Sequence, residues 1–146
     1  MPTLHLDFDP ELPDAPAFAG DTSDLVWFLS WAFAARYGAS HELTLAAVRL
    51  RQAHHVDLAP LLTFADREIE EPADAEELDR VWQDAGPLAD CCEAVVAAFD
   101  ADSELAGLRQ EYPGLRNRLA ELGRAARLAA ERGARVRISY TMTEPA

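Results

Sequence analysis

An almost unbroken apolar stretch, residues 25–35, constrains this chain more than any other feature. Only Ser30 is polar within it, and it carries two of the three tryptophans. A helix that is apolar on nearly every side is a buried helix. Polar residues at 21–24 can cap its start, and Gly38 can take the left-handed turn that ends a helix. The run is far shorter than the roughly 20 residues needed to cross a bilayer, so it predicts a core helix over 22–37 and no membrane segment.

Apolar stripes at helical spacing predict several further helices around this one. They cover about 40–54, 57–71, 74–85, 88–99, 103–108 and 113–132, where Gly86-Pro87 either separates two helices or kinks one. The segment 9–20 contains three prolines and predicts a mobile loop. With 146 residues, the chain is expected to form one domain over 1–146. The predicted fold is mainly α (α+β), with five to seven helices.

The N- and C-terminal segments both alternate apolar and polar residues, the pattern of half-buried strands. Segment 4–9 places aspartates on its outward face, and segment 135–142 places arginines there. Opposite charges across a strand pair stabilise it by a few tenths to about 1 kcal/mol, so we expect the two strands to form one small sheet. A lone two-stranded ribbon is marginal in water. The ribbon must therefore lie on the helices, or be completed by a partner chain or by a homodimer through the C-terminal strand.

The charge of the chain is strongly negative and unevenly placed. The net charge is −13, with 22 acidic and 5 basic side chains in residues 1–108 against 4 and 8 in residues 109–146. An acidic chain repels phosphate, which disfavours nucleic acid as a partner unless the basic end acts alone. The two cysteines, Cys91 and Cys92, are adjacent, and no secretory signal precedes the first strand. These features predict a reducing compartment, with the cytoplasm as the default.

Two charged clusters are the candidate binding surfaces. An acidic face that could dock a basic partner is predicted at Glu68, Glu70, Glu71, Glu76 and Glu77. A basic end that could bind phosphate or an acidic partner is predicted at Arg116, Arg118, Arg124 and Arg127. For the basic end we prefer an internal role, in which the arginines neutralise acids of the same chain or of a second copy.

Two short motifs resemble those of enzyme families. Arg49 and His54 are similar to the Arg-x4-His signature of HEPN-type ribonucleases, small helical domains, and this resemblance implies action on an RNA phosphodiester; Leu50 stands where that family has a polar residue. The pairs Glu68/Glu71 and Glu76/Asp79 resemble the magnesium-holding ExxE and ExxD motifs of MazG-type nucleotide pyrophosphohydrolases. In that family a longer stretch separates the two motifs.

The remaining metal-ligand and nucleophile types form no strong motif. His54, His55 and Asp57 have poor metal spacing, because neighbouring residues on a helix point about 100° apart. Cys92 continues an apolar stripe and is expected to be a buried structural thiol. We predict no metal and no cofactor, and the catalytic residues, if there are any, stay unknown.

These observations favour a small acidic, non-catalytic interaction protein, such as an adaptor, immunity protein, inhibitor or chaperone-like factor, with a protein partner or a homo-oligomeric state. The alternative is a small metal-dependent or nucleotide- or RNA-directed hydrolase that uses the acidic cluster or the surroundings of Arg49 and His54. The sequence favours the interaction protein over the hydrolase, but it does not decide whether the chain is an enzyme.

Overall fold

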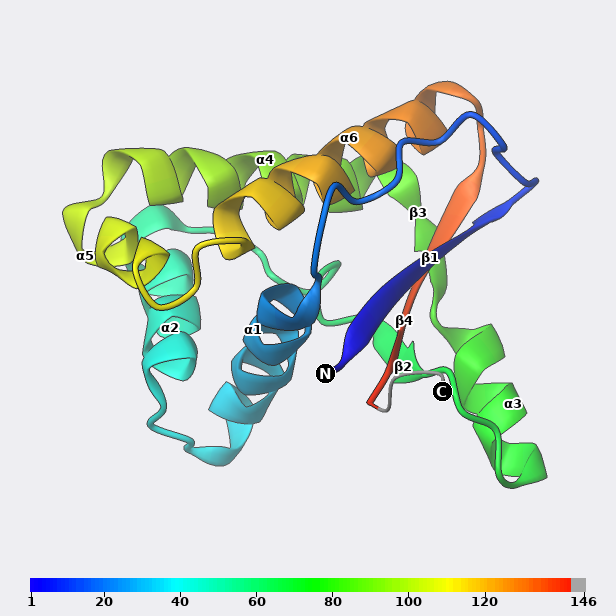
Figure 1. Ribbon diagram of the computed structural model, residues 1–146, viewed down its shortest axis with the longest axis horizontal. Helices are drawn as coiled ribbons and strands as arrows, with labels where there is room; N and C mark the ends of the chain where they lie inside the picture. The colour runs from blue at the N-terminus through cyan, green and yellow to red at the C-terminus, as the bar shows by residue number, and fades with distance from the viewer. Residues whose placement is uncertain (143–146) are drawn as a thin grey trace.

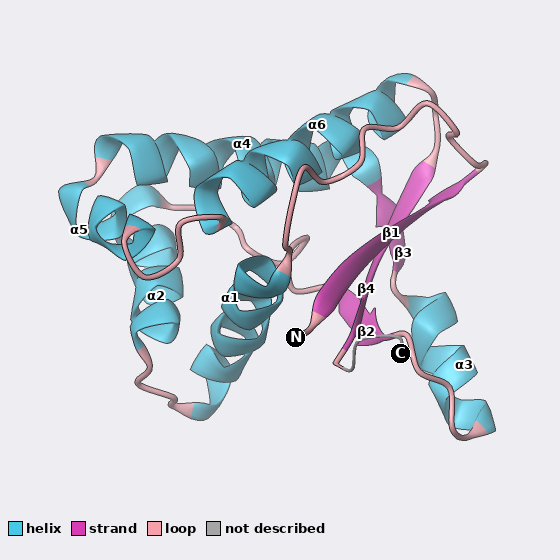
Figure 2. Ribbon diagram, viewed as in Figure 1, coloured by secondary structure: helices cyan, strands magenta, loops and turns pink. Residues whose placement is uncertain are grey.

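Helices and a small sheet form two sides of the molecule in the computed structural model, which describes residues 1–142 (Figures 1 and 2). The helices are α1 (Ser23–Ala34), α2 (Glu42–His54), α3 (Pro72–Arg80), α4 (Ala85–Ala101), α5 (Ser103–Ala106) and α6 (Leu115–Glu131), with short 3-10 turns at Ala35–Tyr37 and Gly107–Arg109. The strands are β1 (Thr3–Asp9), β2 (Phe64–Asp66), β3 (Trp82–Asp84) and β4 (Arg135–Thr141). The predicted fold class is confirmed. No helix among these residues is long and apolar enough to span a membrane.

The sheet is built around β4, the last strand in chain order. β1 pairs antiparallel with one edge of β4, while β2 (parallel) and β3 (antiparallel) follow one another along the other edge. The register places Asp7 opposite Arg137 and Asp9 opposite Arg135, as the charge patterns of the two strands predict. Val136 faces the helices and is fully buried.

Both edges of β4 are hydrogen-bonded within the chain along residues 135–140. One of the alternatives left open by the sequence is a second copy that completes the ribbon along the free edge of the C-terminal strand. That edge is taken instead by β2 and β3, two strands that the sequence analysis does not predict. A homodimer that continues the sheet through β4 has no free edge there to use.

The most extensive helix contact joins α4 and α6, which lie side by side along the top of Figure 1. The predicted apolar seam of α6 is fully buried in this contact, and its members are Leu115, Leu119, Leu122, Ala126 and Ala129. A Cβ at Gly123 would lie 3.0 Å from the Cβ of Cys92, so the glycine permits the close approach. α1 packs beside this pair, against α2, α6 and β1, and its Trp27 is 38% exposed. α1 is therefore part of the core but not its centre.

One of the predicted helices is wrong, and a second is wrong in part. The stripe over 57–71 contains no helix; residues 64–66 form β2 because they pair with residues 138–140 of β4. The stripe over 74–85 ends at Arg80, and β3 follows it before α4 begins at Ala85. Pro87 then lies in the first turn of α4, where its missing N–H costs nothing. Gly86-Pro87 therefore neither separates two helices nor kinks one.

The proline-containing segment 9–20 lies over the body of the molecule. Leu12 and Phe18 pack against the core, and Asp14 forms an ion pair with Arg132 at 2.7 Å. The backbone N–H of Ala19 donates to a carboxylate oxygen of α6. These contacts attach the segment at several points along its length.

Candidate functional site

The predicted acidic face becomes an arm of the molecule, residues 68–79, comprising the turn after β2 and most of α3. Pro72 occupies the first position of α3, where its fixed backbone angle suits a helix start. Glu71 caps the helix, and the carboxylate of Asp74 accepts the backbone N–H groups of Glu70 and Glu71, each at 2.9 Å. These hydrogen bonds hold the pKa of Asp74 below its usual value. Glu71 and Asp74 therefore build the arm.

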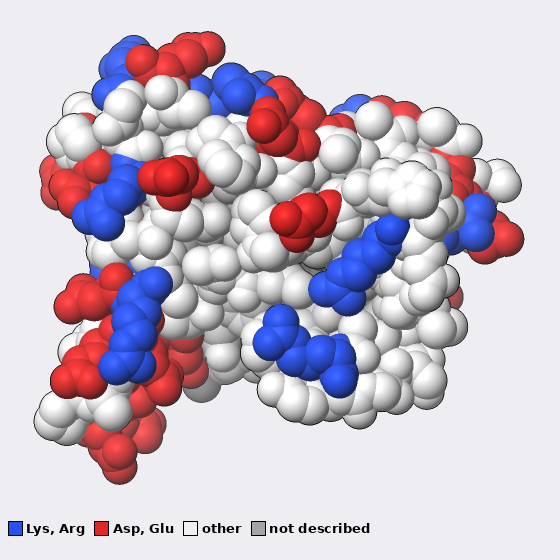
Figure 3. All heavy atoms as spheres, turned by 180° about the vertical axis from the view of Figure 1, so that it is seen from behind, with Lys and Arg blue, Asp and Glu red and all other residues white. Residues whose placement is uncertain are grey.

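The other acidic side chains of the arm face solvent. Figure 3 shows them gathered over α3, at the lower left of that view. Arg80 pairs weakly with Glu76 across one turn, at 3.4 Å. Within the described part of the chain, neither Glu70 nor Glu77 has a hydrogen bond or ion pair from its carboxylate to a cation. Ile69 is 56% exposed between these acids. The arm therefore combines unneutralised negative charge with one exposed apolar side chain.

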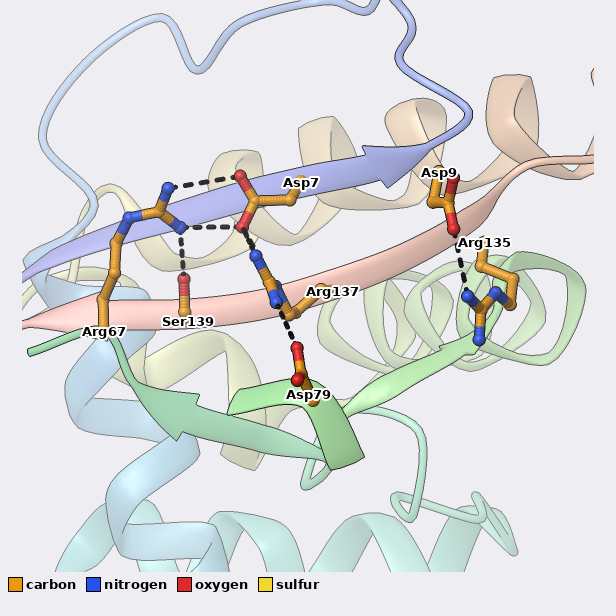
Figure 4. A network of polar contacts seen from close by, with 7 residues as sticks. All are labelled: Asp7, Asp9, Arg67, Asp79, Arg135, Arg137 and Ser139. Atoms are coloured by element: carbon orange, nitrogen blue, oxygen red, sulfur yellow. Dashed lines mark hydrogen bonds and ion pairs between the residues drawn. The ribbon is translucent and has the colours of Figure 1, made fainter. Parts of the chain in front are cut away.

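A polar network on the outer face of the sheet connects the arm to β1 and β4 (Figure 4). Arg67 donates through Nη1 to Asp7 at 2.7 Å and to the buried hydroxyl of Ser139 at 3.0 Å. Arg137 donates to the same Asp7 at 3.1 Å and lies 3.8 Å from Asp79 of the arm. Burial opposes ionisation of Asp7, but the two arginines outweigh it and lower its pKa. The network fixes the base of the arm, and its charges are matched.

No motif in the sequence singles out Arg67, Ser139 or Trp82 of this network. Trp82 lies beneath Arg137, whose guanidinium carbon is 4.5 Å from the ring centroid. An arginine over an indole contributes about 0.5–1 kcal/mol at an exposed site. The outward arginines of β4 were the available signal, because they need partners on neighbouring strands.

The predicted basic end is largely neutralised by acids of the same chain. Arg116 binds Asp100 at 2.7 Å, Arg118 binds Glu121 at 2.8 Å, and Arg127 binds both Asp90 and Glu93 at 2.6 Å. Three of the four predicted residues, Arg116, Arg124 and Arg127, line one groove of about 450 Å³ between α4 and α6. Arg118 does not line it. Arg124 makes no ion pair with another described residue. The geometry agrees with an internal role for these arginines.

Arg49 and His54 lie close together in the structure, and both side chains contact the carboxylate of Asp102. Arg49 Nε and His54 Nε2 contact the same oxygen of Asp102, at 2.6 and 2.7 Å. The side chain of Asp102 is 5% exposed, and its other oxygen accepts the N–H of Glu104 to cap α5. Hydrogen bonds from Arg49 and then His54 lower the pKa of Asp102 strongly. This arrangement joins α2 to the start of α5.

The other predicted ligand types do not converge. His55 ends α2 in the left-handed conformation, with φ at 55°, directly after His54 has turned to Asp102. Cys91 and Cys92 are unpaired and buried, and burial raises the pKa of Cys91 to about 12, so its thiol stays protonated at neutral pH. Across residues 1–142, no three His, Cys, Asp or Glu side chains are placed to hold a metal ion.

Comparison with protein-family models, with curated proteins and with solved structures gives no match.

Proposed function

We propose that this protein is a non-catalytic interaction protein that holds a basic segment of a partner protein on the acidic arm, residues 68–79. The observation that supports this most directly is the imbalance of charge pairing. Three of the four arginines of the basic end, Arg116, Arg118 and Arg127, have acids beside them, whereas Glu70 and Glu77 of the arm have no cation among the described residues. Cationic side chains of a partner would form ion pairs with these carboxylates.

Ile69 adds an apolar contact at the middle of the charged arm. Interfaces take most of their affinity from a few apolar anchors surrounded by polar residues, while the charges increase the association rate and select the partner. Such binding weakens as salt screens the charges. In this proposal the arm acts as a recognition element of an adaptor, inhibitor or chaperone-like protein in the cytoplasm.

A small hydrolase stays the alternative, and the specific observation in its favour is the meeting of Arg49 with His54. Both side chains are engaged with Asp102, however, which also caps α5. Within the acidic cluster, Glu71 and Asp74 are engaged in capping α3. These structural roles leave the hydrolase with less support than the interaction protein.

The test is affinity capture of the partner from an extract of the source cells, with two double variants of equal charge change. Glu70→Lys/Glu76→Lys alters the arm and leaves its capping residues in place. Glu11→Lys/Glu131→Lys alters exposed acids outside the arm. We expect the unaltered protein and the second variant to capture the same stoichiometric partner at moderate salt and to release it at high salt, and the arm variant to capture none. Equal capture by both variants would contradict the proposal, provided that circular dichroism shows both to be folded.

A further inference from the structure

We propose that a pocket between β2 and α3, beside the acidic arm, receives the guanidinium group of an arginine from the partner. This inference rests on the proposed function and names the chemistry of the partner at the same end of the molecule. The pocket has a volume of about 380 Å³. It is not apparent from the sequence, because its sheet wall joins Asp66 and Tyr140 from strands that lie far apart in the chain.

One wall of the pocket is a row of side chains on one face of the sheet. The register pairs Phe64 with Ile138 and Asp66 with Tyr140, so Phe64, Asp66 and Tyr140 share the face that also carries the buried Ile138. The opposite wall comes from the last turn of α3 and the residue after it, with Glu77, Arg80 and Val81. Aromatic rings and carboxylates therefore line the same hollow.

The aromatic rings suit a planar cation. Phe64 and Tyr140 are half-buried, with ring centroids 5.9 Å apart and ring planes at 64° to each other. A guanidinium is attracted to an aromatic face and stacks on it, whereas an ammonium is a compact and strongly hydrated charge. The chain itself uses this contact next to the pocket: Arg36 lies 4.4 Å from the centroid of the Phe33 ring, and that ring packs edge-on against Phe64 with centroids 5.9 Å apart.

The charges at the pocket also favour a cation. Asp66 and Glu77 both line it, and neither has a cationic partner in the described part of the chain. Burial, and then the charge of Asp66, raise the pKa of Tyr140, so its hydroxyl is neutral at physiological pH. An arginine between these walls would place its positive charge beside two unmatched carboxylates and an aromatic face.

Among the described residues that line the pocket, Arg80 is the one with a positive charge. It is 71% exposed and pairs with Glu76 at 3.4 Å, a weak exposed contact. Its charge opposes an incoming guanidinium, so its removal should strengthen binding. A ligand of negative charge would require Arg80. The effect of this residue therefore distinguishes the sign of the ligand's charge.

The experiment is a nuclear magnetic resonance titration of the full chain with the peptide acetyl-Gly-Arg-Gly-amide. A second titration uses the peptide that carries neutral citrulline in place of arginine. We expect shifts at Phe64, Asp66, Glu77 and Tyr140 with the arginine peptide alone. Glu77→Gln should weaken binding about threefold, and Arg80→Ala should strengthen it about twofold. Glu131→Gln, the same change on an exposed acid of α6, should leave the affinity unchanged.

Shifts outside the pocket, equal shifts with citrulline, or weaker binding after Arg80→Ala would overturn the assignment. A third titration uses the peptide with lysine in place of arginine, and equal affinity for this peptide would overturn the choice of a guanidinium. These outcomes are separate from the capture test, because the arm variant used there keeps the pocket residues Asp66, Glu77 and Arg80 and changes only the weakly bound partner of Arg80, Glu76. If the arm variant loses the partner while Glu77→Gln has no effect on peptide binding, the proposed role of the arm is retained and the pocket assignment is rejected.

Discussion

A single carboxylate, that of Asp102, connects two segments that lie far apart in the chain. It joins Arg49 and His54 of α2 to the first turn of α5. The spacing of Arg49 and His54 draws attention to these two residues in the sequence, but Asp102 lies 53 residues beyond Arg49. No local pattern connects Asp102 to Arg49 and His54. The sequence therefore suggests a catalytic pair at a place where the structure has a structural contact between α2 and α5.

Asp102→Asn should lower the melting temperature by several degrees at pH 7, because an amide cannot match the charge of Arg49. The folded-state pKa of Asp102 lies below its unfolded value, so its ionisation stabilises the fold above about pH 4, the ordinary range for this side chain. That stabilisation is lost as the pH falls toward the folded-state pKa. Thermal melts from pH 7 to pH 2 should therefore show the two proteins converging at low pH.

The matched control for this change is Asp57→Asn. Asp57 is exposed and accepts a backbone N–H from Ala59 at 3.0 Å, which an asparagine oxygen can also accept. We expect no change in melting temperature from it. A difference between wild type and Asp102→Asn that stays constant from pH 7 to pH 2 would refute the charge-pairing account.

At the scale of elements, the close packing of α4 on α6 depends on Gly123. Replacing Gly123 with leucine should lower the free energy of unfolding by about 2 kcal/mol, because the added side chain meets Cys92 in a well-packed contact. Leucine is a good helix former, so any loss must come from crowding. Urea denaturation would measure it.

Gly86 of α4 provides the comparison. No described atom beyond the neighbouring residues lies within 4 Å of a Cβ built there, so Gly86→Ala should change the free energy of unfolding by less than about 1 kcal/mol, because the gain in helix propensity is offset by contact of the new Cβ with the ring of Pro87. Similar effects at the two glycines would show that close packing does not decide the outcome at Gly123.

The elements that the sequence predicts well are those whose pattern is complete in one segment. The seam of α6 repeats over four turns, and β1 and β4 alternate over seven residues with opposite outward charges. β2 and β3 are three residues each and owe their conformation to hydrogen bonds with β4. Three residues are too few to distinguish a strand from part of a helical stripe. The apolar residues between 58 and 69 therefore have the spacing of a helix although they do not form one.

The same limit explains the outcome for the candidate site. The acidic face is contiguous in sequence, so the sequence locates it and the structure supplies its shape. The pocket beside it needs Tyr140 from β4 next to Asp66 from β2, a neighbourhood that exists only after the sheet has formed.

Across the whole molecule, stability should be greatest between about pH 5 and pH 8.5 and should fall on both sides. Hydrogen bonds from arginines lower the pKa of Asp100 and Asp102, so their contribution is lost as acid protonates them. Burial raises the pKa of Cys91 and of Cys92, so the unfolded chain loses these protons first and stability falls above about pH 9. Urea denaturation across this range measures both limbs.

Replacing both thiols identifies the origin of the alkaline limb. Cys91→Ala/Cys92→Ala lowers stability at neutral pH by leaving space in the core, but it should flatten the decline between about pH 9 and pH 10. An unchanged slope would assign the alkaline loss to other groups, such as Tyr112, whose pKa burial raises to about 12.

The central position of β4 has a consequence for synthesis of the protein on the ribosome. The side chains of His5 and Thr141, which contact each other across β1 and β4, come from residues 136 positions apart in the chain. Among residues 1–142, β1, β2 and β3 have no strand to pair with other than β4. The first three strands must therefore wait, with exposed backbone, until residue 141 has left the exit tunnel. The α4–α6 pair forms from neighbouring segments and can assemble earlier. The nascent chain thus passes through a stage in which helices are packed and strand edges are open, the kind of species that chaperones bind.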